Sequence, residues 1–144
     1  MTETIESEGS GKHLDRVKQL MAIMKGIVER CKQGDTIGDD DWQPLAELVD
    51  TASFQRVGPF HDEVDWDGYL QVLNGWVNHS EGWDPVVKSM TEVPGLVYAQ
   101  CEEMVTKGDE VSPFYSLSRY EFDEQGKISR IDVYMQAAGL AVHY

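Results

Sequence analysis

Apolar side chains recur every three or four positions from His13 to Gly34, with polar side chains between them. This spacing is typical of a helix that buries one face. Met21 and Met24 lie on the apolar stripe, where methionine more often fills a core than binds a ligand. The pattern therefore predicts a long core helix that ends near Gly34. Its apolar positions are Leu14, Val17, Leu20, Met21, Ile23, Met24, Ile27, Val28 and Cys31.

Two shorter helices are predicted to follow. Three consecutive acids at residues 39–41 precede an expected helix over residues 42–49. Because carboxylate oxygens and negative charge favour the start of a helix, we interpret these acids as a cap and not as a metal site. Asp65 is expected to cap the third helix, over residues 66–78. The inner side of that helix carries Tyr69, Leu70, Leu73, Trp76 and Val77.

Strand patterns dominate the last part of the chain. A short strand over residues 51–57 leads into a loop over residues 58–63. Four longer segments then show strand-like composition, and turns at Pro94-Gly95 and Gly108-Asp109 join the first three. Helices followed by strands joined through tight turns predict an α+β fold with an antiparallel sheet. The four segments cover residues 86–92, 96–106, 111–122 and 128–136.

The size and charge of the chain limit the classes of function that it can have. Its 144 residues suffice for one domain, which we place at residues 13–144 after a disordered tail at residues 1–12. The formal net charge of −14 would repel phosphate backbones and anionic lipids, so we expect no nucleic acid and no membrane as partner. No apolar leader or spanning segment is visible, so we expect a cytoplasmic protein. Cys31 and Cys101 lack a metal-binding spacing and are expected to be free thiols.

The order of a long helix, a capped short helix, a strand, a third helix and long antiparallel strands resembles the nuclear transport factor 2-like superfamily, especially its SnoaL-like and ketosteroid isomerase-like members. The resemblance covers residues 13–136, and it implies a cone in which a curved sheet wraps around three helices and encloses an apolar pocket, often dimerised through the outer sheet face. Members include isomerases, polyketide cyclases, dehydratases, epoxide hydrolases and non-catalytic binding domains, so the resemblance selects no reaction. The segments that carry it are Gly34-Asp35, Leu45-Ala46-Glu47-Leu48 and Phe122-Asp123-Glu124-Gln125-Gly126-Lys127-Ile128.

A two-residue turn at Gly108-Asp109 would fix which strand residues face the pocket. The mostly apolar face is expected to be the inside, together with Ile131, Val133 and Met135 of the last strand. The pairs on this face are Val105 with Ser112, Glu103 with Phe114, Cys101 with Ser116, Ala99 with Ser118 and Val97 with Tyr120. The opposite face is expected to meet water or a partner subunit, which predicts a homodimer. Its residues are Tyr98, Gln100, Glu102, Met104, Tyr115, Arg119, Glu121, Arg130, Asp132 and Tyr134.

Glu103 and Tyr120 are the candidate catalytic residues on the inner face. Apolar surroundings favour the protonated form of a carboxyl group, which suits a general acid or base near neutral pH. Alternatively, Glu103 lies near enough to the turn to reach solvent. The Tyr120 hydroxyl can donate a hydrogen bond to a developing oxyanion, or it can simply complete the packing of the strand.

Further candidates lie around the pocket. Arg56 can enter it and pair with Glu103 or with a ligand carboxylate. Alternatively, it can form a surface pair with Asp62 or Glu63. His61 lies in a loop beside Gly58 and Pro59, where an imidazole can shuttle protons or simply be solvated. The remaining pocket positions are expected to bind the ligand, and they are Phe54, Trp76, Phe114, Ser116, Ser118, Ile131 and Met135.

The resemblance argues against two reactions. Aligned with ketosteroid isomerases, the chain carries Ile27, Arg56 and Ser118 where those enzymes need an oxyanion tyrosine, a base aspartate and a protonated aspartate. Aligned with limonene epoxide hydrolases, the chain carries Val133 where those enzymes have an aspartate on the last strand, unless the register shifts by one residue to Asp132.

Two hypotheses remain. The first is a SnoaL-like cyclase, isomerase or dehydratase that acts on a small hydrophobic molecule through Glu103 with Tyr120 or His61. Proton transfers in a dry pocket need no cofactor, and no residue spacing indicates a metal. The second is a non-catalytic module that binds a hydrophobic ligand or dimerises. Glu103 distinguishes the two, because only the enzyme needs a titrating group in the pocket.

Overall fold

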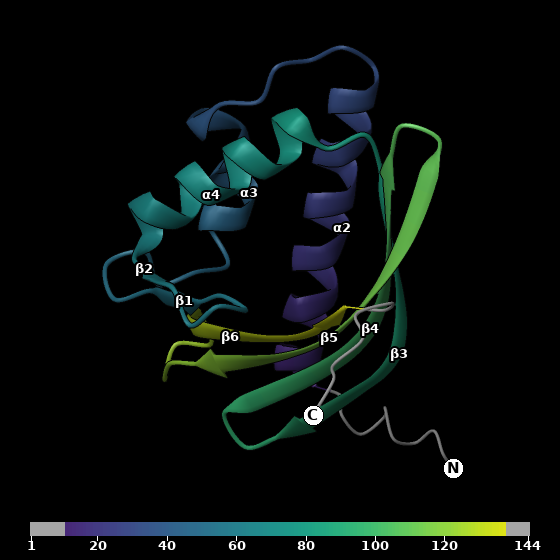
Figure 1. The fold of residues 1–144 in the computed structure, drawn as a ribbon. Coiled ribbons are helices and arrows are strands. Elements are labelled where there is room, and N and C mark those ends of the chain that lie inside the picture. Colours follow the sequence, from purple (N-terminus) through teal and green to yellow (C-terminus); the bar gives the residue numbers. More distant parts are fainter. Residues whose placement is uncertain (1–10, 138–144) are drawn as a thin grey trace.

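The computed structural model describes residues 11–137, in which helices pack on one face of a six-stranded sheet. Figure 1 shows this sheet curving around the long helix α2, with α3 and α4 on the same side. The sheet does not close on itself, because its edge strands β2 and β3 do not pair. The predicted α+β cone is therefore confirmed. The predicted domain, residues 13–144, and the predicted tail, residues 1–12, both extend beyond the described residues. Of the tail, only Gly11 and Lys12 are described.

The long helix α2 spans Lys12–Lys32, and the sequence explains both its position and its end. The stripe predicted from the spacing is the buried face, with Leu14, Val17, Leu20, Ile27 and Val28 inside. Gly34 follows the helix with a φ angle of 106°. Residues with a side chain rarely adopt this angle, so glycine allows the chain to leave the helix there.

The second helical segment is shorter than predicted. A 3-10 turn, η1, spans Asp39–Trp42, and one turn of α-helix, α3, spans Gln43–Ala46. The three acids lie within η1 and do not precede it, and only Asp41 takes part in capping, because its Oδ2 accepts a 2.9 Å hydrogen bond from the Gly38 N–H. Within residues 11–137, no group of three or more His, Cys, Asp or Glu side chains is placed to hold a metal ion.

The third helix, α4, spans Trp66–His79 and starts as predicted. The Asp65 side chain accepts a 2.9 Å hydrogen bond from the Gly68 N–H, which satisfies a free donor of the first turn. Asn74 joins this helix to η1, because its Oδ1 accepts a 2.8 Å hydrogen bond from Trp42 Nε1. None of the described helices is long and apolar enough to cross a membrane.

The sheet has the strand order β2-β1-β6-β5-β4-β3. Only the pairing of β1 with β6 is parallel, and the other described pairs are antiparallel. Residues fully buried beneath the sheet include Trp42, Phe54 and Ile128. The strands are β1 (Gln55–Val57), β2 (Glu63–Val64), β3 (Trp83–Val93), β4 (Leu96–Lys107), β5 (Glu110–Phe122) and β6 (Ile128–Ala137).

The predicted register of the central hairpin is confirmed. Lys107 pairs with Glu110 across a two-residue turn, and all five predicted pairs from Val105 with Ser112 to Val97 with Tyr120 are present. In β6, Ile131, Val133 and Met135 pair with Tyr120, Ser118 and Ser116, so they share the inner face as predicted.

Several strand boundaries differ from the prediction, most of them by one residue. Residues 51–53 form a turn, so β1 covers only the end of the predicted segment, and Glu63 belongs to β2 and not to a loop. Strand β3 begins at Trp83, three residues before the predicted start. A bulge between Val87 and Ser89 inserts one extra residue, so Trp83 and Pro85 face inward opposite Val105 and Glu103.

Candidate functional site

A cavity of about 420 Å³ lies between the concave face of the sheet and the helices α2 and α4. Apolar side chains form most of its wall, including Met21 and Met24, which we had expected to fill the core. Both charged side chains among the described lining residues come from the sheet: the carboxylate of Glu103 and the guanidinium of Arg56. A concave, mostly apolar space with few polar groups is typical of a small-molecule site.

Glu103 is held in place by two hydrogen-bond donors. Trp83 Nε1 donates to its Oε1 over 2.7 Å, and Ser116 Oγ donates to its Oε2 over 2.5 Å. Phe114 on the neighbouring strand β5 is the partner of Glu103, and Ser116 follows it two residues later on the same face. This position places the Ser116 hydroxyl beside the Glu103 carboxylate. Two donated hydrogen bonds, one to each oxygen, restrict the rotation of the carboxylate. Glu103 is therefore a partly buried carboxylate held in one orientation on the cavity wall, with no ion pair to Arg56 among the described residues.

Trp83 is the site residue that sequence reasoning missed. It was left outside the predicted strand, and only the bulge in β3 turns its indole into the cavity. There it packs edge-on against Trp76 from α4, with ring centroids 5.3 Å apart. An extension of the strand pattern back from Val86 would have found the strand but would have turned Trp83 to the wrong face.

Tyr120 and Tyr69 place two phenols on the cavity wall, from β5 and α4. Burial raises the pKa of Tyr120, and nearby Tyr69, Cys101 and Glu103 raise it further. Burial also raises the pKa of Tyr69, although Arg56 opposes this shift. Both phenols are therefore neutral at physiological pH and can donate hydrogen bonds.

Arg56 combines the two arrangements that the sequence left open. It lines the cavity, and it lies near Asp62, with 3.9 Å between Arg56 Nη1 and Asp62 Oδ2. Its guanidinium carbon lies 5.5 Å from the centroid of the Tyr69 ring, a cation–π distance. Glu63, the other predicted surface partner, instead approaches Arg130, at 4.0 Å.

Cys101 also lines the cavity, but it is a poor nucleophile. Burial, and then the charge of Glu103, raises the pKa of its thiol to about 11. The thiol therefore stays protonated near neutral pH. Cys31 on α2 and Cys101 are both free, as expected.

The structure brings most of the predicted site residues together, with two exceptions. Phe54 is buried behind the cavity wall, where it packs against Trp66 and Tyr69 with ring centroids 5.6 and 5.4 Å apart. His61 is exposed and lies on the other side of the sheet, because the loop after β1 folds over the outer face. The predicted residues that line the cavity are Arg56, Trp76, Glu103, Phe114, Ser116, Ser118, Tyr120, Ile131 and Met135.

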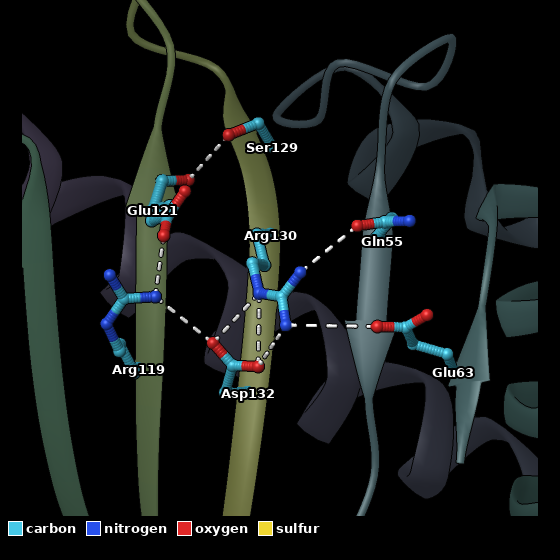
Figure 2. Close-up of polar contacts among 7 residues, drawn as sticks. All are labelled: Gln55, Glu63, Arg119, Glu121, Ser129, Arg130 and Asp132. Carbon is cyan, nitrogen blue, oxygen red and sulfur yellow. Dashed lines mark hydrogen bonds and ion pairs between the residues drawn. The ribbon is translucent and has the colours of Figure 1, made fainter. Parts of the chain in front are cut away.

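His61 lines a second, more polar hollow of about 290 Å³ on the outer face. Figure 2 shows Asp132 there between Arg119 and Arg130, each of which donates it a hydrogen bond of 3.1 Å. Burial opposes ionisation of Asp132, but the hydrogen bonds and charges of the two arginines prevail and lower its pKa. Arg119 also contacts Glu121, at 2.6 Å. Because Asp132 points outward, it supplies no aspartate of the epoxide hydrolase kind to the cavity.

No protein-family model matches this chain, and no curated protein matches it. Solved structures do resemble it. A proposed SnoaL-like polyketide cyclase from Shewanella putrefaciens shares 8% identity, with a TM-score of 0.68 over 93% of this chain and 86% of that one. IdmH, a proposed polyketide cyclase from Streptomyces antibioticus, shares 16% identity, with a TM-score of 0.58 over 82% and 92%.

An LEH-like epoxide hydrolase from M. tuberculosis shares 11% identity, with a TM-score of 0.56 over 80% of this chain and 84% of that one. At these identities the similarity establishes the fold and not a reaction. The chain therefore has the fold of NTF2-like and SnoaL-like proteins, as the order of its elements predicted.

Proposed function

We propose that the protein is a cofactor-independent acid/base enzyme that acts on a hydrophobic metabolite in the cavity. The observation that carries the proposal is the Glu103 carboxylate, fixed by Trp83 and Ser116 on a mostly apolar wall. A side chain that only reached solvent would need neither of these donors. A fixed carboxylate on the wall of a mostly apolar cavity suits proton abstraction from carbon.

The proposed reaction starts with transfer of a proton from a carbon beside a substrate carbonyl to Glu103. The C–H electron pair passes to the carbonyl oxygen as an enolate, and Glu103 becomes a neutral acid. Tyr120 is the candidate donor to the developing oxyanion, because its raised pKa keeps it protonated. Its strand partner Val97 lies six residues along β4 from Glu103, so the role requires the curvature of the sheet to bring its hydroxyl within hydrogen-bond distance of a carbonyl held at Glu103.

The fate of the enolate would decide the overall reaction. Return of the proton to another carbon gives an isomer, and attack of the enolate carbon on a second carbonyl closes a ring. Loss of a neighbouring hydroxyl group, which takes the proton of Glu103 and leaves as water, gives dehydration. Each route needs the same base and the same hydrogen-bond donor.

Deuterium uptake tests the first step without knowledge of the substrate. Methyl nonyl ketone in deuterated water is the probe, and exchange beside its carbonyl is followed by NMR. We expect the wild-type protein to accelerate exchange and Glu103→Gln to slow it about a hundredfold. Glu102→Gln is the matched control, because Glu102 lies on the outer face, 3.5 Å from Lys88. Exchange at the wild-type rate in Glu103→Gln would contradict the proposal.

A second function, a non-catalytic binding module for a hydrophobic ligand, is favoured by the scarcity of titratable groups in the cavity. Trp76 and Trp83 line the cavity and report occupancy through their fluorescence. Binding of methyl nonyl ketone without any exchange would support this second function.

We also propose a homodimer formed through the outer sheet face around Tyr98, Tyr115, Arg119 and Tyr134. Tyr115 and Tyr134 are 39% and 60% exposed, an unusual amount of aromatic surface to leave in water. Light scattering at micromolar concentration should give twice the mass of one chain, and the mass of a single chain would refute the dimer.

A further inference from the structure

We propose that the Arg56 end of the cavity is a carboxylate-binding subsite, and that the ligand is an elongated apolar molecule with one anionic head group. The inference rests on the proposed function only in placing the substrate in the same cavity. Among the described lining residues, Arg56 is the cation and Glu103 is the anion, so the cavity has two ends of opposite charge.

The Arg56 guanidinium has unused hydrogen-bonding capacity. Its side chain is 17% exposed, and its Nε is buried without a hydrogen-bond partner in the described part of the chain. The approach to Asp62, at 3.9 Å, is too long for a hydrogen bond, and Asp62 is itself half-exposed. Nε itself is closed to solvent, so a ligand oxygen would meet the guanidinium at its Nη groups, which donate no hydrogen bond within the described residues.

The position of this guanidinium is already fixed before a ligand binds. Tyr69 holds it through a cation–π contact and also lines the cavity. On its other side, Gly58 is buried, and a side chain there would collide with Arg56 Nη1 and with Asp62. A planar guanidinium held in this way matches the two oxygens of a carboxylate better than a flexible amine would.

The sheet register separates Arg56 from Glu103. Arg56 pairs with Ile131, and Ile131 pairs with Tyr120. Tyr120 in turn pairs with Val97 on β4, and Glu103 lies six residues farther along that strand. Six residues correspond to about 20 Å of extended strand, which the curvature of the sheet shortens through space. A ligand anchored at Arg56 therefore directs its apolar body toward Glu103, where a second carboxylate would be repelled.

Calorimetric titration of the full chain with four probes of equal chain length tests the subsite. We expect dodecanoate to bind about tenfold more tightly than dodecanol, since it adds a charge-assisted hydrogen bond. Dodecanedioate should bind more weakly than dodecanoate, because its second carboxylate meets Glu103. Dodecylammonium can bind in the reverse direction with its cation at Glu103, so its binding should depend on Glu103 and not on Arg56. Equal affinities for dodecanoate and dodecanol would overturn the inference.

Two variants distinguish the contribution of Arg56 to ligand binding from the contribution of the apolar cavity wall. Arg56→Met keeps the length of the side chain and is expected to abolish the preference for dodecanoate while dodecanol still binds. Asp62→Asn removes the competing anion from an exposed position, so it should tighten dodecanoate several-fold and leave dodecanol unchanged. A persistent preference in Arg56→Met, or no tightening in a folded Asp62→Asn, would overturn the subsite.

Glu103→Gln distinguishes this inference from the enzyme proposal. The variant should keep the preference for dodecanoate over dodecanol and should accept dodecanedioate more readily than the wild type. Carboxylate preference in a wild-type protein that exchanges no deuterium would support the subsite and contradict the enzyme. Exchange without carboxylate preference would overturn the subsite alone.

Discussion

Trp83 and Ser116 give the Glu103 carboxylate a single orientation, because each donates to a different oxygen. A proton acceptor is effective only when it is aligned with the bond that it breaks. Trp83 is therefore a positioning residue under the proposed function, whereas its neighbour Trp76 lines the cavity without a hydrogen bond to Glu103 among the described residues.

Trp83→Phe keeps an aromatic ring in the cavity but removes the donor to Glu103. We expect kcat for ketone exchange to fall about tenfold with little change in KM, because the base loses alignment and not its binding surface. The stability should fall by about 1 kcal/mol for the lost hydrogen bond. Trp76→Phe is the matched control, and an equal loss of kcat in that variant would show that both residues act through packing.

Asp132 has a structural role on the outer face. It is 7% exposed and accepts hydrogen bonds from Arg119 and Arg130, so these three side chains form one network across β5 and β6. The pKa of Asp132 is lowered in the folded state, so the network stabilises the fold only while Asp132 is ionised.

Asp132→Asn should cost about 2 kcal/mol of stability at neutral pH, because two half-buried arginines lose their shared anion. The stabilisation is fully present above the unfolded-state pKa, near pH 4, and is lost as pH falls through the lower folded-state value. Denaturant unfolding at pH 7 and pH 3 should therefore show the difference between variant and wild type shrinking in acid. Asp84→Asn, at an exposed pair with Lys25, is the control and should change little. A constant difference at both pH values would contradict the role given to Asp132.

At the scale of elements, two glycines differ in whether the backbone requires glycine at their position. Gly26 lies in the middle of α2, and a side chain there would meet no neighbouring atom within 4 Å. Gly126, in the turn between β5 and β6, has a φ angle of 81°. Only the second position needs the conformational freedom of glycine.

Gly26→Ala should therefore stabilise the protein by about 1 kcal/mol, because alanine favours the helix and restricts the unfolded chain. Gly126→Ala has equal space around it and should destabilise by at least as much, because alanine is strained at that φ angle. Thermal unfolding of the two variants beside the wild type measures both effects. Stabilisation by both changes would show that backbone strain at Gly126 is negligible.

The β4–β5 hairpin could be predicted residue by residue, and β3 could not. The Gly108-Asp109 turn fixes the register of an uninterrupted ladder, so Glu103 and Tyr120 were assigned to the correct face from sequence. In β3 the bulge reverses the alternation, and no local residue pattern marks it, so Trp83 was missed. The loop after β1 was equally unpredictable, because tertiary packing carries His61 away from the cavity.

At the scale of the whole molecule, the net charge of −14 opposes the compact state through self-repulsion. Ion pairs such as that of Arg30 with Asp41 reduce this repulsion only locally. Salt at moderate concentration screens charges farther apart than about 8 Å and so acts more on this repulsion than on close pairs.

Raising sodium chloride from about 0.01 M to about 0.15 M should therefore increase Tm, at a fixed protein concentration. Differential scanning calorimetry measures the shift. Sucrose of equal osmolality is the control for effects that do not depend on charge. A Tm that falls with salt would mean that ion pairs outweigh the net repulsion.

The bulge in β3 has an evolutionary consequence. Because Val87 pairs with Cys101 and Ser89 with Gln100, Lys88 is the unpaired extra residue. A one-codon deletion at Lys88 would leave every cross-strand partner in place, so the gene can lose a codon there while the cavity keeps its lining. The same deletion in β4 between Glu103 and Gly108 would either break the Gly108-Asp109 turn or shift Glu103 and the residues before it in β4 by one position against β5. Selection would therefore tolerate length variation in one strand of this sheet and purge it from its neighbour.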